Sequence, residues 1–180
     1  MSNTSVVTGI TNAGLSILAQ AQLGANIQFT KIKIGDGQLS EGQDPAELTD
    51  LINSVNELGI YNWSMSGDST IKVTGLIVQG ETGFYFREIG LFAIDPSTEQ
   101  EVLYAYGNKG DAASYIPENS SNISVEERAT IITKVANAET VQIQVSRLYG
   151  PIFYQEIRHK TIDIDFVTNI NDAEFIEINE

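Results

Sequence analysis

An arginine and a glutamate stand side by side, at Arg87 and Glu88, inside the most apolar run of the chain. Such residues could be a catalytic pair acting on one substrate. Neighbouring residues of a strand point to opposite faces, however, so the two side chains cannot easily reach the same substrate atom. Each charge then needs a partner on its own side, because a buried unpaired charge is very costly. The pattern favours a structural or interface role.

The chain has one histidine, His159, and no cysteine. Disulfides, thiolate metal sites and a two-histidine metal site within one chain are therefore excluded. Any nucleophile–base pair would depend on His159, and no serine stands in a nucleophile-elbow motif. The sequence predicts no catalytic, cofactor-binding or metal-binding residue, and we do not expect an enzyme.

Two other groups could bind small ions. Gly35-Asp36-Gly37 might hold a phosphate, but the lysine and the following helix of a phosphate-binding loop are missing, so a turn is favoured. Asp163 and Asp165 could bind a hard cation such as calcium. The rest of a ligand set is not recognisable, and a solvated acidic face is favoured over a metal site.

Tyrosines are candidates for an interface, because their rings are apolar and their hydroxyl groups need a partner. Tyr115 stands in a long segment, 107–121, that reads mostly as loop, and long loops usually have a binding role. It is the preferred interface residue. Tyr104 and Tyr106 are expected to share one strand face at the edge of the core.

The composition limits the partners. Ten basic and 24 acidic residues give a formal charge of −14, which argues against nucleic acid and anionic membranes and favours a basic partner protein. No apolar run approaches the roughly 20 residues of a membrane span, and no signal peptide is visible, so we expect a soluble protein made in the cytoplasm. A chain of 180 residues suits one domain with a small appendage.

The local patterns predict an α+β fold, a mainly antiparallel sheet with two N-terminal helices, over residues 1–150. The first helix, 11–23, is capped by Thr11 or Asn12, has an apolar stripe at Leu15, Ile17, Leu18 and Ala21, and ends at Gly24. The second begins at Asp44-Pro45 and extends to about Val55. Strands are expected at 27–34, 60–65, 70–78 with a bulge at Gly75, and 101–106, followed by a hairpin of 124–135 and 139–147.

The run 83–95 is apolar on both faces, which predicts a strand that is covered on both sides and central to the sheet. Gly90 within it suggests a bulge or a close backbone approach.

Beyond Gly150-Pro151, residues 151–180 are interpreted as an extended acidic arm. Residues 161–180 contain six acids and no base. Ile162, Ile164 and Phe166 alternate with acids, as on an edge strand that can add to another sheet. We therefore expect this arm to contact a neighbouring subunit or partner.

Several ordered motifs resemble one family: TNAGLSILAQA, FTKIKIGDG, REIGLFAIDP and VLYAYGNKGDAASYIP. From about Thr8 to about Val145 the chain is similar to the N-terminal domain of phage tail-collar fibre proteins, the module that joins a tail fibre to the baseplate. The resemblance implies a virion structural component of a contractile or related tail that takes part in host attachment. It also implies baseplate proteins and a tail fibre polypeptide as partners, and a homotrimer.

In that family the domain usually continues into a shaft and a receptor-binding tip, whereas this chain stops at Glu180 without a shaft-like repeat. An adaptor for a separate fibre polypeptide, or a baseplate part, is therefore expected. A phage-tail-like bacteriocin would use the same piece. The alternative from another class is a small carbohydrate-binding receptor-recognition protein of the tail tip.

Overall fold

A computed structural model describes residues 4–7 (backbone), 9–67, 69–77, 82–118, 127–136 and 141–143. Its elements, in chain order, are β1 (Thr4–Val7), β2 (Gly9–Ile10), α1 (Asn12–Gln22), β3 (Ile27–Gly35), the 3-10 turn η1 (Pro45–Glu47), β4 (Ser54–Met65), β5 (Thr70–Ile77), β6 (Phe84–Phe86), β7 (Glu88–Ile94), β8 (Glu101–Asn108), the 3-10 turn η2 (Gly110–Ala112), β9 (Ser114–Ile116), β10 (Glu127–Lys134) and β11 (Val141–Ile143).

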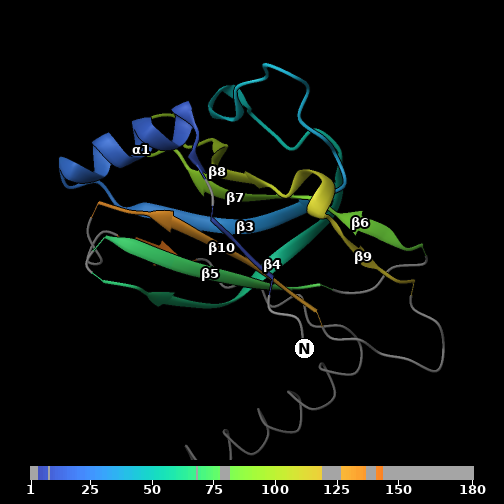
Figure 1. The fold of residues 1–180 in the computed structure, drawn as a ribbon. Coiled ribbons are helices and arrows are strands. Elements are labelled where there is room, and N and C mark those ends of the chain that lie inside the picture. Colours follow the sequence, from blue (N-terminus) through green and yellow to red (C-terminus); the bar gives the residue numbers. More distant parts are fainter. Residues whose placement is uncertain are drawn as a thin grey trace, which may run out of the picture. The chain divides into compact units, whose positions relative to one another are not determined.

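The described strands form a mainly antiparallel half-barrel with one N-terminal helix. Their order is β1-β10-β5-β4-β3-β7-β8-β2, with β11 beside β3 and a separate ribbon of β6 and β9. Strand β4 bends between two partners: its first half pairs with β3 up to Gly59, and from Ile60 it pairs with β5. Figure 1 shows the consequence, with β3, β7 and β8 in one layer and β5 and β10 in the layer below. The apolar core, including Ile32, Ile60 and Ile131, is buried between them.

Helix α1 confirms the first predicted helix. The Thr11 side chain caps it by accepting a hydrogen bond from the Gly14 amide at 3.0 Å. Ile17 is fully buried, whereas Leu15 is 49% exposed, so the predicted apolar stripe is wrong at that position. The buried face instead includes Gly14, where a Cβ atom would collide with the Tyr104 carbonyl of β8. Gly14 therefore lets the helix lie directly against the strand.

The predicted second helix, 44–55, is wrong. Only η1 forms there, although the Asp44 side chain does cap it. A longer helix would direct the amides of Ile52 and Asn53 to carbonyls one turn earlier. In this protein both amides donate to the Glu88 carboxylate instead, and β4 begins directly afterwards.

The apolar run 83–95 splits into two strands. Strand β7 lies inside the sheet between β3 and β8, as predicted, but β6 belongs to the separate ribbon. Gly90 is not a bulge, because the register shift between β7 and β8 follows Leu91. The predicted close backbone approach is not found either, because side chains fill the space beside Gly90: a Cβ there would lie 2.5 Å from Leu51 Cδ1 and 2.7 Å from Leu103 Cδ1.

Register shifts also change which residues share a face. The shift between β7 and β8 makes Tyr104 an extra residue on β8. Tyr104 consequently lies in the main core, edge-on to Phe29 at 5.1 Å, while Tyr106 packs with Leu103 in a second cluster. The prediction that Tyr104 and Tyr106 share a face is therefore wrong. The bulge predicted at Gly75 lies on the partner strand β4, at the level of Ile60.

The predicted hairpin of 124–135 and 139–147 is also wrong. Strand β10 pairs with β5 and β1, and β11 runs parallel to β3 along Ile27–Phe29. That stretch of β3 is open to a new strand because β4 pairs with β3 only from Lys31 onward. The arm 151–180 with Ile162, Ile164 and Phe166, together with His159, Asp163 and Asp165, lies outside the described residues.

Candidate functional site

Glu88, the first residue of β7, is fully buried and accepts four hydrogen bonds. Its Oε1 accepts from the amides of Gly37 at 3.0 Å and Asn53 at 2.8 Å. Its Oε2 accepts from the Ile52 amide at 3.0 Å and the Tyr106 hydroxyl at 2.8 Å. This geometry suits a carboxylate, which has only acceptors. Glu88 thereby anchors both ends of the loop 36–53 to the sheet.

Arg87 donates hydrogen bonds to backbone carbonyl groups, whereas Glu88 accepts them mainly from backbone amides. Its Nη1 donates to the Asp36 carbonyl at 2.6 Å and its Nε donates to the Gly110 carbonyl at 3.0 Å. Within the described part of the chain, no ion pair joins Arg87 to Glu88. Each charge has polar partners of its own, which are backbone carbonyls for Arg87 and backbone amides with the Tyr106 hydroxyl for Glu88. Arg87 lies between β6 and β7, so the two residues do not share one strand as predicted.

The glycines of Gly35-Asp36-Gly37 are explained by this anchor. A Cβ on Gly37 would lie 2.5 Å from Glu88 Oε1, and a Cβ on Gly35 would lie 2.6 Å from the same oxygen. The turn thus does receive an anion, but the anion is the protein's own carboxylate. Nothing in the local sequence pattern connects Gly37 with Glu88, which are 51 positions apart.

Asn108 completes the arrangement, and sequence reasoning missed it. Its Nδ2 donates to the Gly37 carbonyl at 3.1 Å and to the Tyr106 hydroxyl at 2.9 Å, and its Oδ1 accepts from the Gly110 amide at 2.8 Å. Burial, with a contribution from the Glu88 carboxylate, raises the pKa of Tyr106, so its hydroxyl remains a donor. We call Arg87, Glu88, Tyr106 and Asn108 the clasp.

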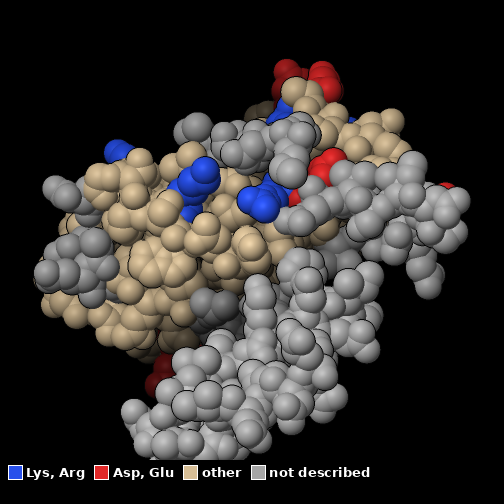
Figure 2. All heavy atoms as spheres, turned by 90° about the horizontal axis from the view of Figure 1, so that it is seen from below, with Lys and Arg blue, Asp and Glu red and all other residues tan. Residues whose placement is uncertain are grey.

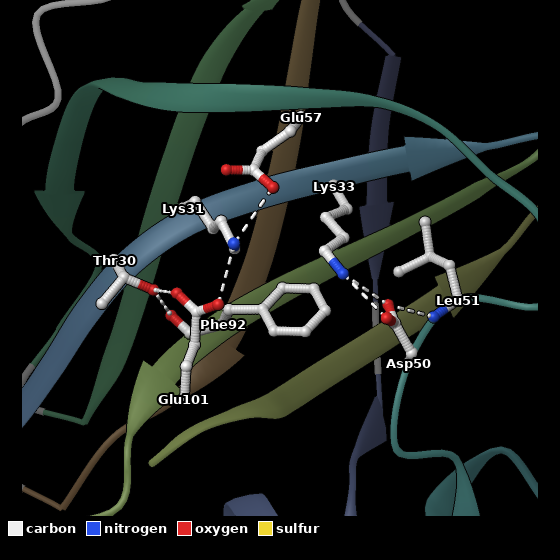
Figure 3. Close-up of polar contacts among 8 residues, drawn as sticks. All are labelled: Thr30, Lys31, Lys33, Asp50, Leu51, Glu57, Phe92 and Glu101. Carbon is white, nitrogen blue, oxygen red and sulfur yellow. Dashed lines mark hydrogen bonds and ion pairs between the residues drawn. The ribbon is translucent and has the colours of Figure 1, made fainter. Parts of the chain in front are cut away.

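A second polar cluster lies on β3 and its neighbours (Figure 3). Lys31 Nζ lies 2.8 Å from Glu101 and 3.0 Å from Glu57, and Lys33 Nζ lies 2.8 Å from Asp50. Lys33 Nζ also lies over the Phe92 ring, 4.5 Å from its centroid. Both cations of this strand are therefore paired within the molecule.

The pairing changes the pKa values of this cluster. Burial lowers the pKa of Lys31, but hydrogen bonds and charges from Glu101 and Glu57 outweigh it, and the net shift is upward. Burial raises the pKa of Glu101, but the contacts with Lys31 and with Thr30, whose hydroxyl donates at 2.6 Å, outweigh it and lower the pKa overall. The cluster braces β3 against β4 and β8.

Tyr115 lies on the short strand β9, which corrects the prediction that it stands in a loop. It is directly opposite Tyr85 of β6 in the ribbon register. The two rings are 5.2 Å apart at a 59° tilt, and the residues are 55% and 53% exposed. We call Tyr85 and Tyr115 the tyrosine pair. Tyr85 was missed, although its alternation with Phe84 and Phe86, both buried, is a signal for an outward position.

Lys109 supports the base of the same ribbon. Its Nζ lies 4.1 Å from the centroid of the Phe86 ring and has no hydrogen-bond partner among the described residues. Burial lowers the pKa of Lys109, and the negative charge of Glu127, which raises it, offsets only part of this shift. The ring thus stabilises a partly desolvated cation at the point where β6 meets the clasp.

The described residues include no group of three or more His, Cys, Asp or Glu side chains placed to hold a metal ion. In the same part of the chain, no helix has the length and apolar character that a membrane crossing requires.

The charged residues of the clasp and of the β3 cluster hold backbone and strands in place. A family model described as phage tail-collar fibre protein, N-terminal, matches residues 1–166, and the chain belongs to this family. It is a structural protein of a phage tail and hence of the virion, it is not an enzyme, and other tail proteins are its partners. Comparisons with curated proteins and with solved structures found no match.

The match confirms the resemblance of the sequence motifs and extends further along the chain. It continues past residue 150, where the sequence predicts the domain to end, and includes Ile162, Ile164 and Phe166.

Proposed function

We propose that this protein attaches a tail fibre to the baseplate, with the tyrosine pair as part of its contact surface. The observation that carries the proposal is the exposed Tyr85–Tyr115 pair on a ribbon that the clasp holds in place. Strand β6 leads directly into Arg87, and the Arg87 guanidinium binds Gly110 just before β9. A prearranged aromatic surface loses little conformational freedom on binding, which favours affinity.

The partners in this proposal are baseplate proteins and a tail fibre polypeptide. The chain acts as a homotrimer, and the arm 151–180 makes contacts outside its own globular domain. The formal charge of −14 favours a basic surface on the partner. Membership of a tail fibre family supports this assignment.

The test compares particles assembled with wild-type protein and with the double variant Tyr85→Ser/Tyr115→Ser. We expect much less variant protein in purified tails, measured by quantitative mass spectrometry, with unchanged circular dichroism. Tyr61→Ser is the matched control, because Tyr61 of β4 is 45% exposed and lies on a different strand. Equal incorporation of the double variant and of wild type would refute the role of the tyrosine pair.

The same exposed rings are the observation that supports the second candidate, a carbohydrate-binding receptor-recognition protein of the tail tip. A glycan array with the purified chain separates the two functions. Glycan binding that disappears in the double tyrosine variant would favour the second candidate over attachment to the baseplate.

The arm has its own test. Deleting residues 151–180 should leave a folded domain with similar circular dichroism that no longer assembles. Light scattering that finds the full-length chain monomeric, both alone and with its tail partners, would contradict this part of the proposal.

A further inference from the structure

Helix α1 presents an uncharged face to solvent. Its buried side consists of Gly14, Ile17 and Ala21. The helical repeat places six exposed residues on the opposite side: Asn12, Leu15, Ser16, Ala19, Gln22 and, at the C-terminal end, Leu23. Leu15 is 49% exposed and Leu23 is 90% exposed, so two large apolar side chains lie in solvent on this side. We call these six residues the α1 face.

The absence of charge is unusual for this chain. The solvent side of a surface helix normally carries charged and polar residues. All 10 basic and 24 acidic residues of this protein come after Thr30, so residues 1–30 contain no charged side chain. In Figure 1, α1 lies above β3, and β5 and β10 lie below it. Figure 2 views the molecule from below, the side away from α1, and shows Lys and Arg side chains there. The α1 face thus differs from that side in having no charge.

We propose that the α1 face packs against the α1 face of a second copy of this chain. Leu15, Ala19 and Leu23 repeat every four residues and form a ridge along the helix. Ridges of this spacing interdigitate when two helices cross, and the small side chains of Ser16 and Ala19 let the helices approach closely. The inference rests on the homo-oligomer of the proposed function, and it names the surface through which the copies meet.

The chemistry of the α1 face favours a second copy over a basic partner. Like charges that meet across an interface are costly, and two copies of a chain of charge −14 meet at least cost where neither carries a charge. The polar groups of Asn12, Ser16 and Gln22 both donate and accept hydrogen bonds, so they can pair with the same groups of an identical copy. A basic partner gains more at an acidic surface, such as the exposed Glu41, Asp44 and Glu47 of the loop 36–53.

The size of the helix indicates how much this contact contributes. Helix α1 has 11 residues, which corresponds to a length of about 16 Å. One pair of such helices buries less surface than the roughly 1,200–2,000 Å² of a stable interface. The contact between α1 faces therefore adds to the proposed contacts of the arm 151–180 and does not replace them.

Disulfide crosslinking of the full-length protein tests the contact. The chain has no cysteine, so a single introduced thiol can link only to the same thiol of another copy. Ala19→Cys places this thiol at the middle of the ridge, where two α1 faces cross. We expect disulfide-linked dimers under mild oxidation at least about tenfold faster than with Gln38→Cys, because proximity raises the effective thiol concentration. Gln38 is the control, because it is exposed in the loop 36–53, away from α1.

Charge variants test the same contact by equilibrium measurement. Leu15→Glu/Ala19→Glu puts two like charges on each α1 face, and it should raise the dissociation constant for self-association by about tenfold or more. Circular dichroism should not change, because both residues are exposed and glutamate is a good helix former. Gln38→Glu/Gln100→Glu is the control, because it changes the net charge equally at exposed residues outside the α1 face. Analytical ultracentrifugation over a range of concentrations measures both variants.

The outcomes separate this inference from the proposed function. Equal crosslinking rates for the two cysteine variants, or equal self-association of the two charge variants, overturn only the contact between α1 faces. A wild-type chain that stays monomeric at all concentrations overturns the homo-oligomer of the proposed function as well. Ala19→Cys that reacts quickly with a maleimide in the isolated oligomer but slowly in assembled tails would assign the α1 face to a different tail protein, which also overturns the inference.

Discussion

The clasp can be tested by replacing Glu88 with glutamine and with alanine. Glu88 is fully buried, and both of its oxygens accept two hydrogen bonds. In Glu88→Ala, three backbone amides and the Tyr106 hydroxyl lose their acceptor. Each buried unsatisfied donor costs about 1–3 kcal/mol, and water entering the space offsets part of this. We expect a loss of about 4–6 kcal/mol in the free energy of unfolding, a large share of the stability of a domain.

Glutamine should cost less, for a reason visible in the geometry. Its single carbonyl oxygen can still accept from Gly37 and Asn53. Its amino group then faces the Ile52 amide, a donor, and the Tyr106 hydroxyl, which can turn and accept. One backbone amide is left without an acceptor and meets a second donor, so the expected cost is about 2–3 kcal/mol.

The measurement is urea unfolding followed by circular dichroism, together with hydrogen exchange of individual amides. In Glu88→Ala the amides of Gly37, Ile52 and Asn53 should all exchange faster, whereas in Glu88→Gln the largest increase should be at Ile52, the amide that loses its acceptor. Glu57→Gln is the control, because the Glu57 side chain is 52% exposed and its ion pair with Lys31 is worth about 1 kcal/mol or less. Equal unfolding free energies for Glu88→Gln and Glu57→Gln, or unchanged protection of the three amides in Glu88→Ala, would refute the role of Glu88.

Three further predictions follow from the packing and charges. Gly37→Ala should lower the unfolding free energy by about 2 kcal/mol or more, since its Cβ would lie 2.5 Å from Glu88 Oε1, whereas Gly9→Ala, with nothing within 4 Å, should be close to neutral. Phe86→Ala and Phe92→Ala, both at buried positions, should each lower the free energy of unfolding in urea by about 3–5 kcal/mol, and the exposed Gln142→Ala should lower it by about 0.5 kcal/mol or less. Similar unfolding midpoints for all three variants would contradict the strand assignment. The pKa of Glu101 is lowered in the folded state, so the pairing of its carboxylate stabilises the fold above the unfolded value near 4.5, and this stabilisation is lost as the pH falls below that value. Wild type should therefore lose part of its free energy of unfolding between about pH 5 and pH 3, and Glu101→Gln should not lose this part. Unfolding at several pH values measures the difference.

Much of the local structure could be predicted from neighbouring residues. The α1 cap at Thr11, strand β3 and the antiparallel pair β4–β5 depend on signals within a few positions, and the structure has all of them. The exposed Gln142 between the half-buried Val141 and Ile143 likewise follows the two-residue alternation of a strand. The need of Arg87 and Glu88 for separate partners was foreseeable, because a buried charge without a partner of its own is very costly.

The identity of those partners could not be predicted. The Glu88 oxygens bind amides that lie 35, 36 and 51 positions away, and only the fold brings them together. This long-range bonding also explains the wrong second helix, since the Asp44 cap is present but the amides of Ile52 and Asn53 are taken by Glu88. The residues that predict a helix locally carry no information about a competing hydrogen-bond acceptor on a strand far away in the sequence.

The sequence by itself determined the family, through its ordered motifs, and the element types wherever caps, glycines and alternation act locally. The tertiary structure decided which faces are buried and which strands are neighbours. One extra residue at Tyr104 moved it to the opposite side of the sheet from Tyr106, and the departure of β4 toward β5 opened the edge of β3 to β11. The physical reason is that strand side chains repeat every two residues, so a single bulge inverts the pattern, and bulges are set by pairing with distant strands.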